Sequence, residues 1–256
     1  MNKKKRIMKI LAALTAFVLI GVVLFFVNAF LGNPVSYLLA RHSASQYIEE
    51  NYPEADFDID GISYFFEDAK YSVSIKSPSS IDSHFTIKTD FAGRIKYNSY
   101  ESDILKKGNT IERINRDYYD MVSAVFSSPV FPYETSHAFA KVYISYDEIL
   151  NSEQNGVILT EELELDKIYD MKEVGEKAGT VILSVRDEVS VEKAAEILEK
   201  TKLLLNSAEV YFNRIDFILE EKHSPDIKVE KRINLDGFPA AFIGSEDLKE
   251  RIELYK

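Results

Sequence analysis

The chain has 256 residues, of which 46% are hydrophobic and 29% are charged, a composition typical of globular proteins and unlike that of disordered tails. Five of its 31 basic residues precede residue 10, so the chain beyond residue 31 holds 26 Lys and Arg against 42 Asp and Glu, a net charge of −16. That acidic balance excludes the basic footprint of nucleic-acid-binding proteins. Cysteine is absent, which excludes disulfides, a lipid-attachment cysteine and thiolate metal sites.

A basic segment followed by an apolar segment opens the chain. Residues 1–9 carry five basic side chains, and residues 10–31 carry no charged side chain. A helix rises about 1.5 Å per residue, so the apolar segment reaches roughly 33 Å, enough to cross the hydrocarbon core of a bilayer. We therefore predict a transmembrane helix over residues 10–31, with the lipid bilayer as its partner.

The basic residues also predict the orientation of this helix. Only Arg41 is basic among the first ~15 residues after the apolar segment, so the positive-inside rule puts the N-terminus in the cytoplasm. The alternative is a cleaved secretory signal with its processing site at residues 27–29, near Ala29. The apolar stretch before that site is longer than the ~7–15 residues typical of a signal, which favours an uncleaved signal-anchor. We expect a single-pass protein of the cell membrane whose bulk is extracytoplasmic.

Residues 33–105 are predicted to form a helix followed by a four-stranded antiparallel meander, an α+β domain. Asn33 can cap the helix and Pro34 can begin it. After Pro53 the apolar period changes from 3.6 to 2, which indicates strands. The predicted packed stripe of the helix contains Val35, Leu38, Leu39, His42, Tyr47 and Ile48, and the four strands contain Phe57 to Phe66, Tyr71 to Ile75, Phe85 to Thr89 and Ile95 to Tyr100. No stalk separates this domain from the apolar segment, so we expect it to sit directly on the lipid headgroups.

The first 105 residues resemble the YfjL-like family. The resemblance rests on the basic N-terminus and on Asn33-Pro34, His42, residues 50–53, residues 63–65, residues 71–73 and Phe85. It implies a membrane-anchored envelope protein of a Gram-positive bacterium, and it brings neither an assigned activity nor catalytic residues. The helix-plus-meander pattern also resembles cystatin-like and PepSY-type modules, which implies a binding or inhibitory domain on grounds of fold alone.

Residues 108–256 are predicted to form a second, small α+β domain. Asn109, Asp170, Ser190 and Ser245 are the predicted N-caps of its helices. Residues 151–156 are predicted to be a loop. The predicted strands contain Phe139 to Ile144, Thr180 to Arg186, Ile215 to Leu219 and Ile227 to Ile233.

A calcium-loop pattern lies at the start of the meander. Asp56, Asp58, Asp60, Gly61 and Glu67 have the spacing of an EF-hand loop, in which alternating carboxylates converge on one hard cation. An EF-hand needs flanking helices, whereas Pro53 ends the preceding helix and the following residues alternate as a strand. We favour an exposed acidic strand, with these four carboxylates as the candidate metal ligands of the alternative.

Other reactive-residue patterns are incomplete. Ser190 and Lys193 fit S-x-x-K of penicillin-recognising serine enzymes, but the S-D-N and K-T-G elements are missing, so Ser190 is interpreted as a helix cap. None of the four histidines has metal-ligand spacing to another. Tyrosines can line a groove for a peptide or a glycan, although core packing is the more ordinary role of an aromatic side chain. The candidate tyrosines are Tyr97, Tyr100, Tyr118, Tyr119, Tyr133 and Tyr143, and the histidines are His42, His84, His137 and His223.

These observations favour a membrane-anchored extracytoplasmic protein that binds an envelope protein or peptide without catalysis and without a cofactor. Two alternatives remain open. One is an envelope hydrolase whose site is assembled only in three dimensions, and the other is a calcium-stabilised ectodomain.

Overall fold

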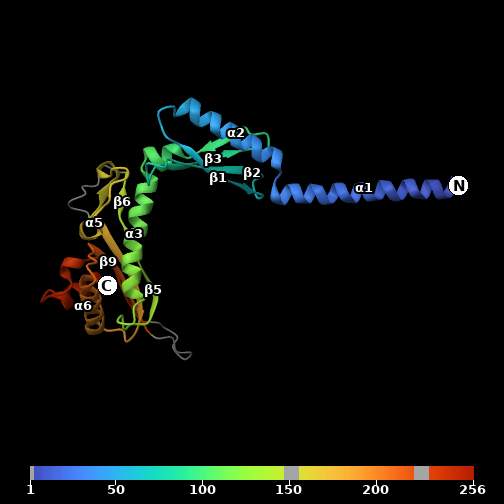
Figure 1. Ribbon diagram of the computed structural model, residues 1–256. Coiled ribbons are helices and arrows are strands. Elements are labelled where there is room, and N and C mark those ends of the chain that lie inside the picture. Colours follow the sequence, from blue (N-terminus) through green and yellow to red (C-terminus); the bar gives the residue numbers. More distant parts are fainter. Residues whose placement is uncertain (1–2, 147–155, 222–230) are drawn as a thin grey trace. The chain divides into compact units, whose positions relative to one another are not determined.

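The computed structural model describes residues 3–146, 156–221 and 231–256 (Figure 1). The chain divides into two compact units, residues 1–106 (unit 1) and 107–256 (unit 2). Each unit has its own hydrophobic core. The α+β class and the N-terminal helix followed by a four-stranded antiparallel sheet are as predicted from the sequence.

Helix α1 (Lys3–Leu31) contains the apolar segment. Its large apolar side chains from residue 7 onward are 46% to 77% exposed, so the protein itself does not cover them. The helical stretch Ile7–Asn51 includes a window with a mean hydropathy of 3.0, and it is the one stretch of the described residues long and apolar enough to cross a membrane. Gly32, with a φ of +71°, ends the helix.

Unit 1 packs helix α2 (Pro34–Asn51) on a four-stranded antiparallel meander. The strands are β1 (Asp58–Phe65), β2 (Lys70–Lys76), β3 (His84–Thr89) and β4 (Ile95–Asn98), in the order β1-β2-β3-β4. The predicted cap is confirmed, because the Asn33 side chain accepts a hydrogen bond from the Ser36 N–H at 2.8 Å, and Pro34 begins the helix.

The predicted packed stripe of α2 is correct only at its C-terminal end, where Ile48 is buried and Tyr47 packs against the core. The buried side chains are Ser36, Ala40, Ala44 and Ile48, spaced by four residues. Small side chains let the helix approach the sheet closely, and Val35 and Leu38 consequently face outward with 67% and 63% of their surface exposed.

The end of the fourth strand also differs from the prediction. Strand β4 ends at Asn98, and Tyr100 follows it and directly precedes a π-helical turn, η1 (Glu101–Leu105).

Unit 2 contains a mixed four-stranded sheet in the order β10-β9-β8-β5. Strands β8 and β9 are parallel and are joined through helix α6 (Val191–Ser207), whereas the two outer pairs are antiparallel. Six of the eight residues of β8 are buried, so both faces of this strand are covered. The strands are β5 (Thr135–Val142), β8 (Gly179–Arg186), β9 (Arg214–Glu220) and β10 (Arg232–Pro239), with a separate parallel pair, β6 (Ile144–Ser145) and β7 (Ile158–Leu159).

The helices of unit 2 are α3 (Gly108–Phe126), α5 (Met171–Ala178), α6 (Val191–Ser207) and α7 (Leu248–Tyr255), with 3-10 turns η2 (Thr160–Glu162) and η3 (Ala240–Phe242). Asp170 and Ser190 cap α5 and α6 as predicted. The predicted caps Asn109 and Ser245 are wrong: Lys107, in the left-handed conformation, precedes α3, and Asp247 precedes α7. The predicted loop at residues 151–156 and the predicted strand start at Ile227 fall largely outside the described residues.

Candidate functional site

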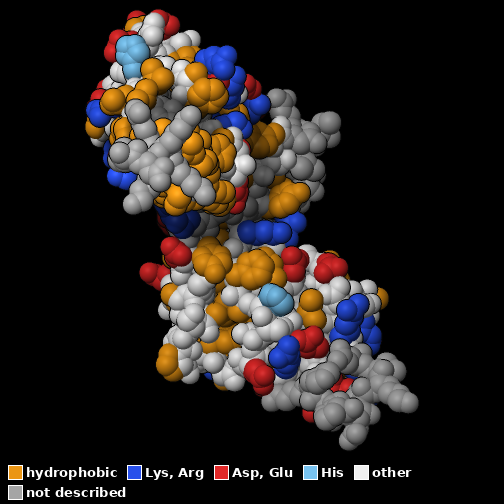
Figure 2. Space-filling view, turned by 90° about the vertical axis from the view of Figure 1, so that its right-hand side faces the viewer, with side chains coloured by type: hydrophobic (Ala, Val, Ile, Leu, Met, Phe, Trp, Pro, Cys, Tyr) orange, Lys and Arg blue, Asp and Glu red, His pale blue; other side chains and the backbone are white. Residues whose placement is uncertain are grey.

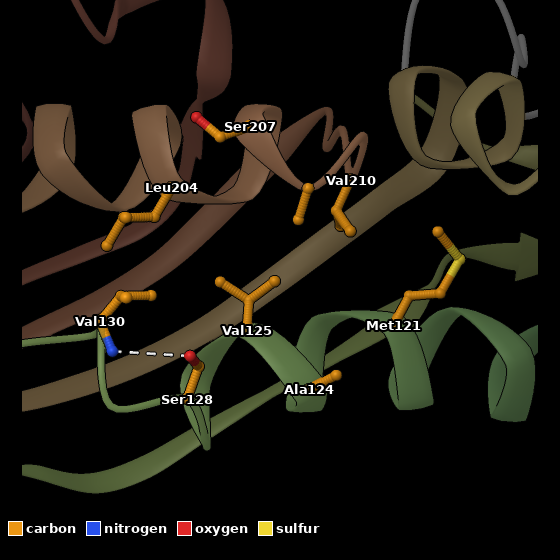
Figure 3. Close-up of a pocket in the computed structure, with 9 residues that line it drawn as sticks. Met121, Ala124, Val125, Ser128, Val130, Leu204, Ser207 and Val210 are labelled. Carbon is orange, nitrogen blue, oxygen red and sulfur yellow. Dashed lines mark hydrogen bonds between the residues drawn. The ribbon is translucent and has the colours of Figure 1, made fainter.

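An apolar groove lies between α3 and α6 in unit 2 (Figure 3). It has a volume of about 520 Å³, within the range of small-ligand pockets. Figure 3 shows the side chains of Val125 and Val130 on one wall, with Leu204 and Val210 opposite. The lining residues are Met121, Ala124, Val125, Ser128, Val130, Leu204, Ser207, Ala208 and Val210.

The sequence builds this groove from the margins of two amphipathic helices. On α3, Tyr118, Val122 and Val125 are buried in the core, and Ala124 lies just outside that stripe and is exposed. On α6, Leu205 is buried, while Leu204 next to it is half-buried. Ala124 on α3 and Ala208 after α6 have small side chains. They leave a space between the two helices, and this space forms the groove.

The chemistry of the groove is apolar. None of its lining side chains is an acid, a base or a histidine. Its two hydroxyls have local partners: the Ser207 Oγ donates to the Leu203 carbonyl at 2.7 Å, and the Ser128 Oγ accepts from the Val130 N–H at 3.5 Å. A serine without a neighbouring base is a weak nucleophile. The groove is therefore suited to holding an apolar group.

A second hollow of about 400 Å³ carries titratable side chains, and several of them have partners within the protein. Glu162 pairs with Lys177 at 2.5 Å, and Asp170 caps α5. Lys167 pairs with Glu164 at 2.6 Å, which lowers the pKa of the Glu164 carboxyl and raises the pKa of the Lys167 ammonium. This arrangement is that of surface ion pairs, which contribute little to stability.

The structure places two of the four candidate calcium ligands on β1 and the other two outside this strand, one beyond each end. Asp58 and Asp60 lie exposed on β1, Ile59 between them is half-buried, and Phe57, directly before the strand, is half-buried as well. Glu67 lies in the turn beyond the other end of β1, so about seven residues at ~3.3 Å each separate it from Asp60.

Two of these carboxylates have protein partners. Asp56 accepts a hydrogen bond from the Ser77 hydroxyl at 2.5 Å, which holds the pKa of its carboxyl below the usual value. Asp60 pairs with Lys76. Among residues 3–146, 156–221 and 231–256, no three His, Asp or Glu side chains are grouped closely enough to hold a metal ion.

Ser190 is a helix cap, as interpreted from the sequence. The Ser190 hydroxyl accepts from the Lys193 N–H at 3.2 Å, as expected of a helix cap, and the Lys193 ammonium pairs with Glu196. His223 lies outside the described residues.

Two of the six candidate tyrosines serve in packing. Tyr118 is fully buried, and Tyr100 stacks on Tyr52 at 4.3 Å in the core of unit 1. The groove between α3 and α6 was not predicted. Its only signal in the sequence is the apolar residues beside the buried stripe of each helix.

The geometry defines a class of protein: an apolar N-terminal helix followed by two α+β units with an apolar groove in the second. The model of the YfjL-like N-terminal domain matches residues 7–99, and that of the YfjL-like C-terminal domain matches residues 117–253. The chain therefore belongs to the YfjL-like family, and the relationship extends well beyond the first 105 residues that carried the resemblance. Comparisons with curated proteins and with solved structures gave no significant match.

Proposed function

We propose that this protein is a single-pass membrane protein whose two units lie outside the cytoplasm and bind an envelope protein or peptide without catalysis. The observation that carries the proposal is α1, whose apolar surface is left uncovered although both units have complete cores. Transfer of apolar surface out of water stabilises a protein by about 25 cal/mol per Å², so a bilayer is the favourable environment for this helix.

The charge distribution supports the proposed orientation. Five basic residues precede the apolar segment, and the chain after residue 31 has a net charge of −16. Basic residues next to a span are retained in the cytoplasm, while an acidic domain is well suited to solubility outside it.

The groove between α3 and α6 supports a binding role. It offers an apolar volume of about 520 Å³ and no titratable side chain. An apolar side chain of a bound peptide or protein fits this chemistry, because apolar anchors that fill pockets supply most of the affinity of protein interfaces.

Fusion reporters on the carboxyl end test the orientation. Alkaline phosphatase fused after Lys256 should be active, and a cytosol-dependent fluorescent protein at the same place should be dark. The reverse result would exclude the proposed orientation, and a shortened product released into the medium would show that the anchor is cleaved.

Site-specific photocrosslinking in intact cells tests the binding role. A photoreactive side chain at Leu204, in the groove, should trap a discrete partner. The matched control is Leu203, which is 59% exposed on the same helix and does not line the groove. Equal trapping at both positions, or none at Leu204, would overturn the assignment of the groove.

A further inference from the structure

The end of unit 1 at which α1 joins it presents large apolar side chains to solvent. Phe65 pairs with Lys70 at the end of β1 and β2, and Thr89 pairs with both Tyr71 and Ile95. The β1–β2 turn and the β3–β4 turn therefore lie at the same end of the sheet. The exposed apolar residues at this end, which we call the apolar rim, are Val35, Leu38, Phe65, Phe66 and Phe91.

Helix α1 is attached at this same end. The Tyr64 hydroxyl donates to the Ala29 carbonyl at 3.0 Å, and the rings of Phe30 and Phe66 are 5.7 Å apart. A cavity of about 280 Å³ is lined jointly by the end of α1, the β1–β2 turn and Phe91. The contact between Phe30 and Phe66 thus joins the apolar surface of the helix to the β1–β2 turn.

The rim also includes the first turns of α2. The Tyr71 hydroxyl holds the backbone of Asn33, directly before α2, and a Cβ placed on Gly93 would lie 3.0 Å from the Leu39 carbonyl. The start of α2 is therefore held at the end of β2 next to the β1–β2 turn, and Leu39 lies against the β3–β4 turn. The outward residues Val35 and Leu38 are 67% and 63% exposed. Figure 2 views the molecule along α1, and the hydrophobic side chains gathered in its upper part include those of this helix.

The charges around the rim differ from those of the rest of the outer chain. The two turns and their flanking strand ends carry the carboxylates Glu67, Asp68 and Asp90 and four cations, Lys70, Lys88, Arg94 and Lys96. Asp68 pairs with Lys70, and Asp90 pairs with Arg94 and Lys96. The strong acidity seen beyond residue 31 as a whole is absent here, so an anionic headgroup layer does not repel this end.

We infer that the apolar rim inserts into the headgroup–acyl boundary of the bilayer that α1 crosses, so that unit 1 rests on the membrane. This inference rests on the proposed membrane anchoring by α1. The apolar segment ends at residue 31, which puts Phe30 at the edge of the hydrocarbon, and Phe66 contacts Phe30. Aromatic side chains gather at this boundary, and surfaces of this kind bury themselves about 5–10 Å into it.

Tryptophan fluorescence tests this inference directly, because the chain contains no Trp. Full-length variants Phe66→Trp and Phe91→Trp, reconstituted in phosphatidylcholine vesicles, report the polarity and depth of each turn. Ile81→Trp is the matched control, since Ile81 is 52% exposed and follows the opposite end of β2. Phe25→Trp, within α1, is the reference for full insertion.

The expected result is an order of depth among the four variants. Phe66→Trp and Phe91→Trp should show blue-shifted emission and strong quenching by lipids brominated near the headgroup. The emission of Ile81→Trp should stay unshifted and be little quenched, and that of Phe25→Trp should be quenched most by bromines deep in the acyl chains.

Two other outcomes would count against these proposals, and they are distinguishable. If the two rim variants emit and are quenched like Ile81→Trp while Phe25→Trp is deeply quenched, the rim contact is overturned and the anchor stands. If Phe25→Trp is not quenched, the membrane anchor itself is contradicted.

Discussion

The hydroxyl of Tyr71 contacts both backbone groups of Asn33: it accepts from the N–H at 2.7 Å and donates to the carbonyl at 3.1 Å. Tyr71 belongs to β2, and Asn33 is the residue between α1 and α2 that caps α2. The passage from the apolar helix to the folded unit is therefore fixed by the sheet.

Tyr71→Phe should loosen this joint. The side chain is 2% exposed, so the variant keeps the packing and loses two hydrogen bonds at a buried site. We expect the free energy of unfolding of unit 1 to fall by about 1–3 kcal/mol and the Asn33 amide to exchange faster. Hydrogen exchange and urea unfolding of the full chain in detergent measure both. Tyr97→Phe, at a position that is 50% exposed, is the control, and equal effects of the two variants would contradict the role of Tyr71.

The sequence predicts the elements of unit 1 well because capping and alternation are local. Asn33 and Pro34 give the start of α2, and the period of two gives the meander. Most of the packed face of α2 was predicted wrongly, because side-chain hydrophobicity favours Val35 and Leu38 whereas close packing on the sheet selects small residues such as Ala40. The choice between these faces depends on how the helix meets the sheet, which lies outside any local pattern.

The candidate groove shows the same limit. Periodicity predicts α3 and α6 as amphipathic helices, but Met121 and Leu204 are more than 80 residues apart in the chain. Whether their margins meet depends on the parallel pairing of β8 and β9, a long-range feature. The start of α3 after Lys107 was not predictable either, because lysine rarely adopts the left-handed conformation that Lys107 has here.

Gly175→Ala should destabilise unit 2 although alanine favours helices. A Cβ at this position of α5 would lie 2.2 Å from the Tyr211 carbonyl oxygen and 2.9 Å from the ring of Tyr118. Overpacking of this kind costs about 1–3 kcal/mol, which exceeds the ~1 kcal/mol gained in helix propensity. Thermal unfolding of the full chain measures the loss. The control is Gly61→Ala, where a Cβ meets nothing within 4 Å, and an equal or smaller loss at Gly175 would refute the packing argument.

Tyr118 should make the stability of unit 2 sensitive to alkali. Its side chain is fully buried and its hydroxyl donates to the Tyr211 carbonyl at 2.7 Å. Burial raises the pKa of the Tyr118 phenol above its ordinary value of 10. The folded state thus holds its proton more tightly than the unfolded state, so this stabilisation is complete below pH 10 and is lost as the pH rises beyond it.

Tyr118→Phe isolates this contribution. The variant should lose about 1 kcal/mol near neutral pH, because the Tyr211 carbonyl loses its donor. Above pH 10, titration of Tyr118 should lower the free energy of unfolding of the wild type by up to about 1.4 kcal/mol per pH unit. The variant should lack this contribution to the pH dependence. Urea unfolding at pH 8 and pH 11 provides the comparison. Parallel losses in both proteins would mean that Tyr118 does not titrate as described.

Calcium should leave the thermal midpoint of the full chain unchanged. Asp60 lies near the start of β1 and Glu67 in the turn beyond its end, whereas calcium requires all its oxygen ligands at about 2.3–2.6 Å. A ligand that binds only the folded state would raise the midpoint. Thermal melts with calcium and with a chelator therefore distinguish a chain that binds calcium from one that does not. Asp60→Asn with Glu67→Gln serves as the matched variant. A calcium-dependent rise that this double variant abolishes would establish the metal site instead.

Filling the groove between α3 and α6 should prevent partner binding without unfolding unit 2. Ala124 is exposed and lines the groove, so Ala124→Phe places a ring in the volume that an apolar side chain of the partner would occupy. A surface substitution of this kind usually changes stability by less than about 0.5 kcal/mol. Photocrosslinking from Val130 in intact cells should then yield little of the trapped product. Leu203→Phe, on the same α6 surface but outside the groove, should leave the yield unchanged. If both variants crosslink as well as the parent chain, the partner binds elsewhere and the groove is only a gap in packing.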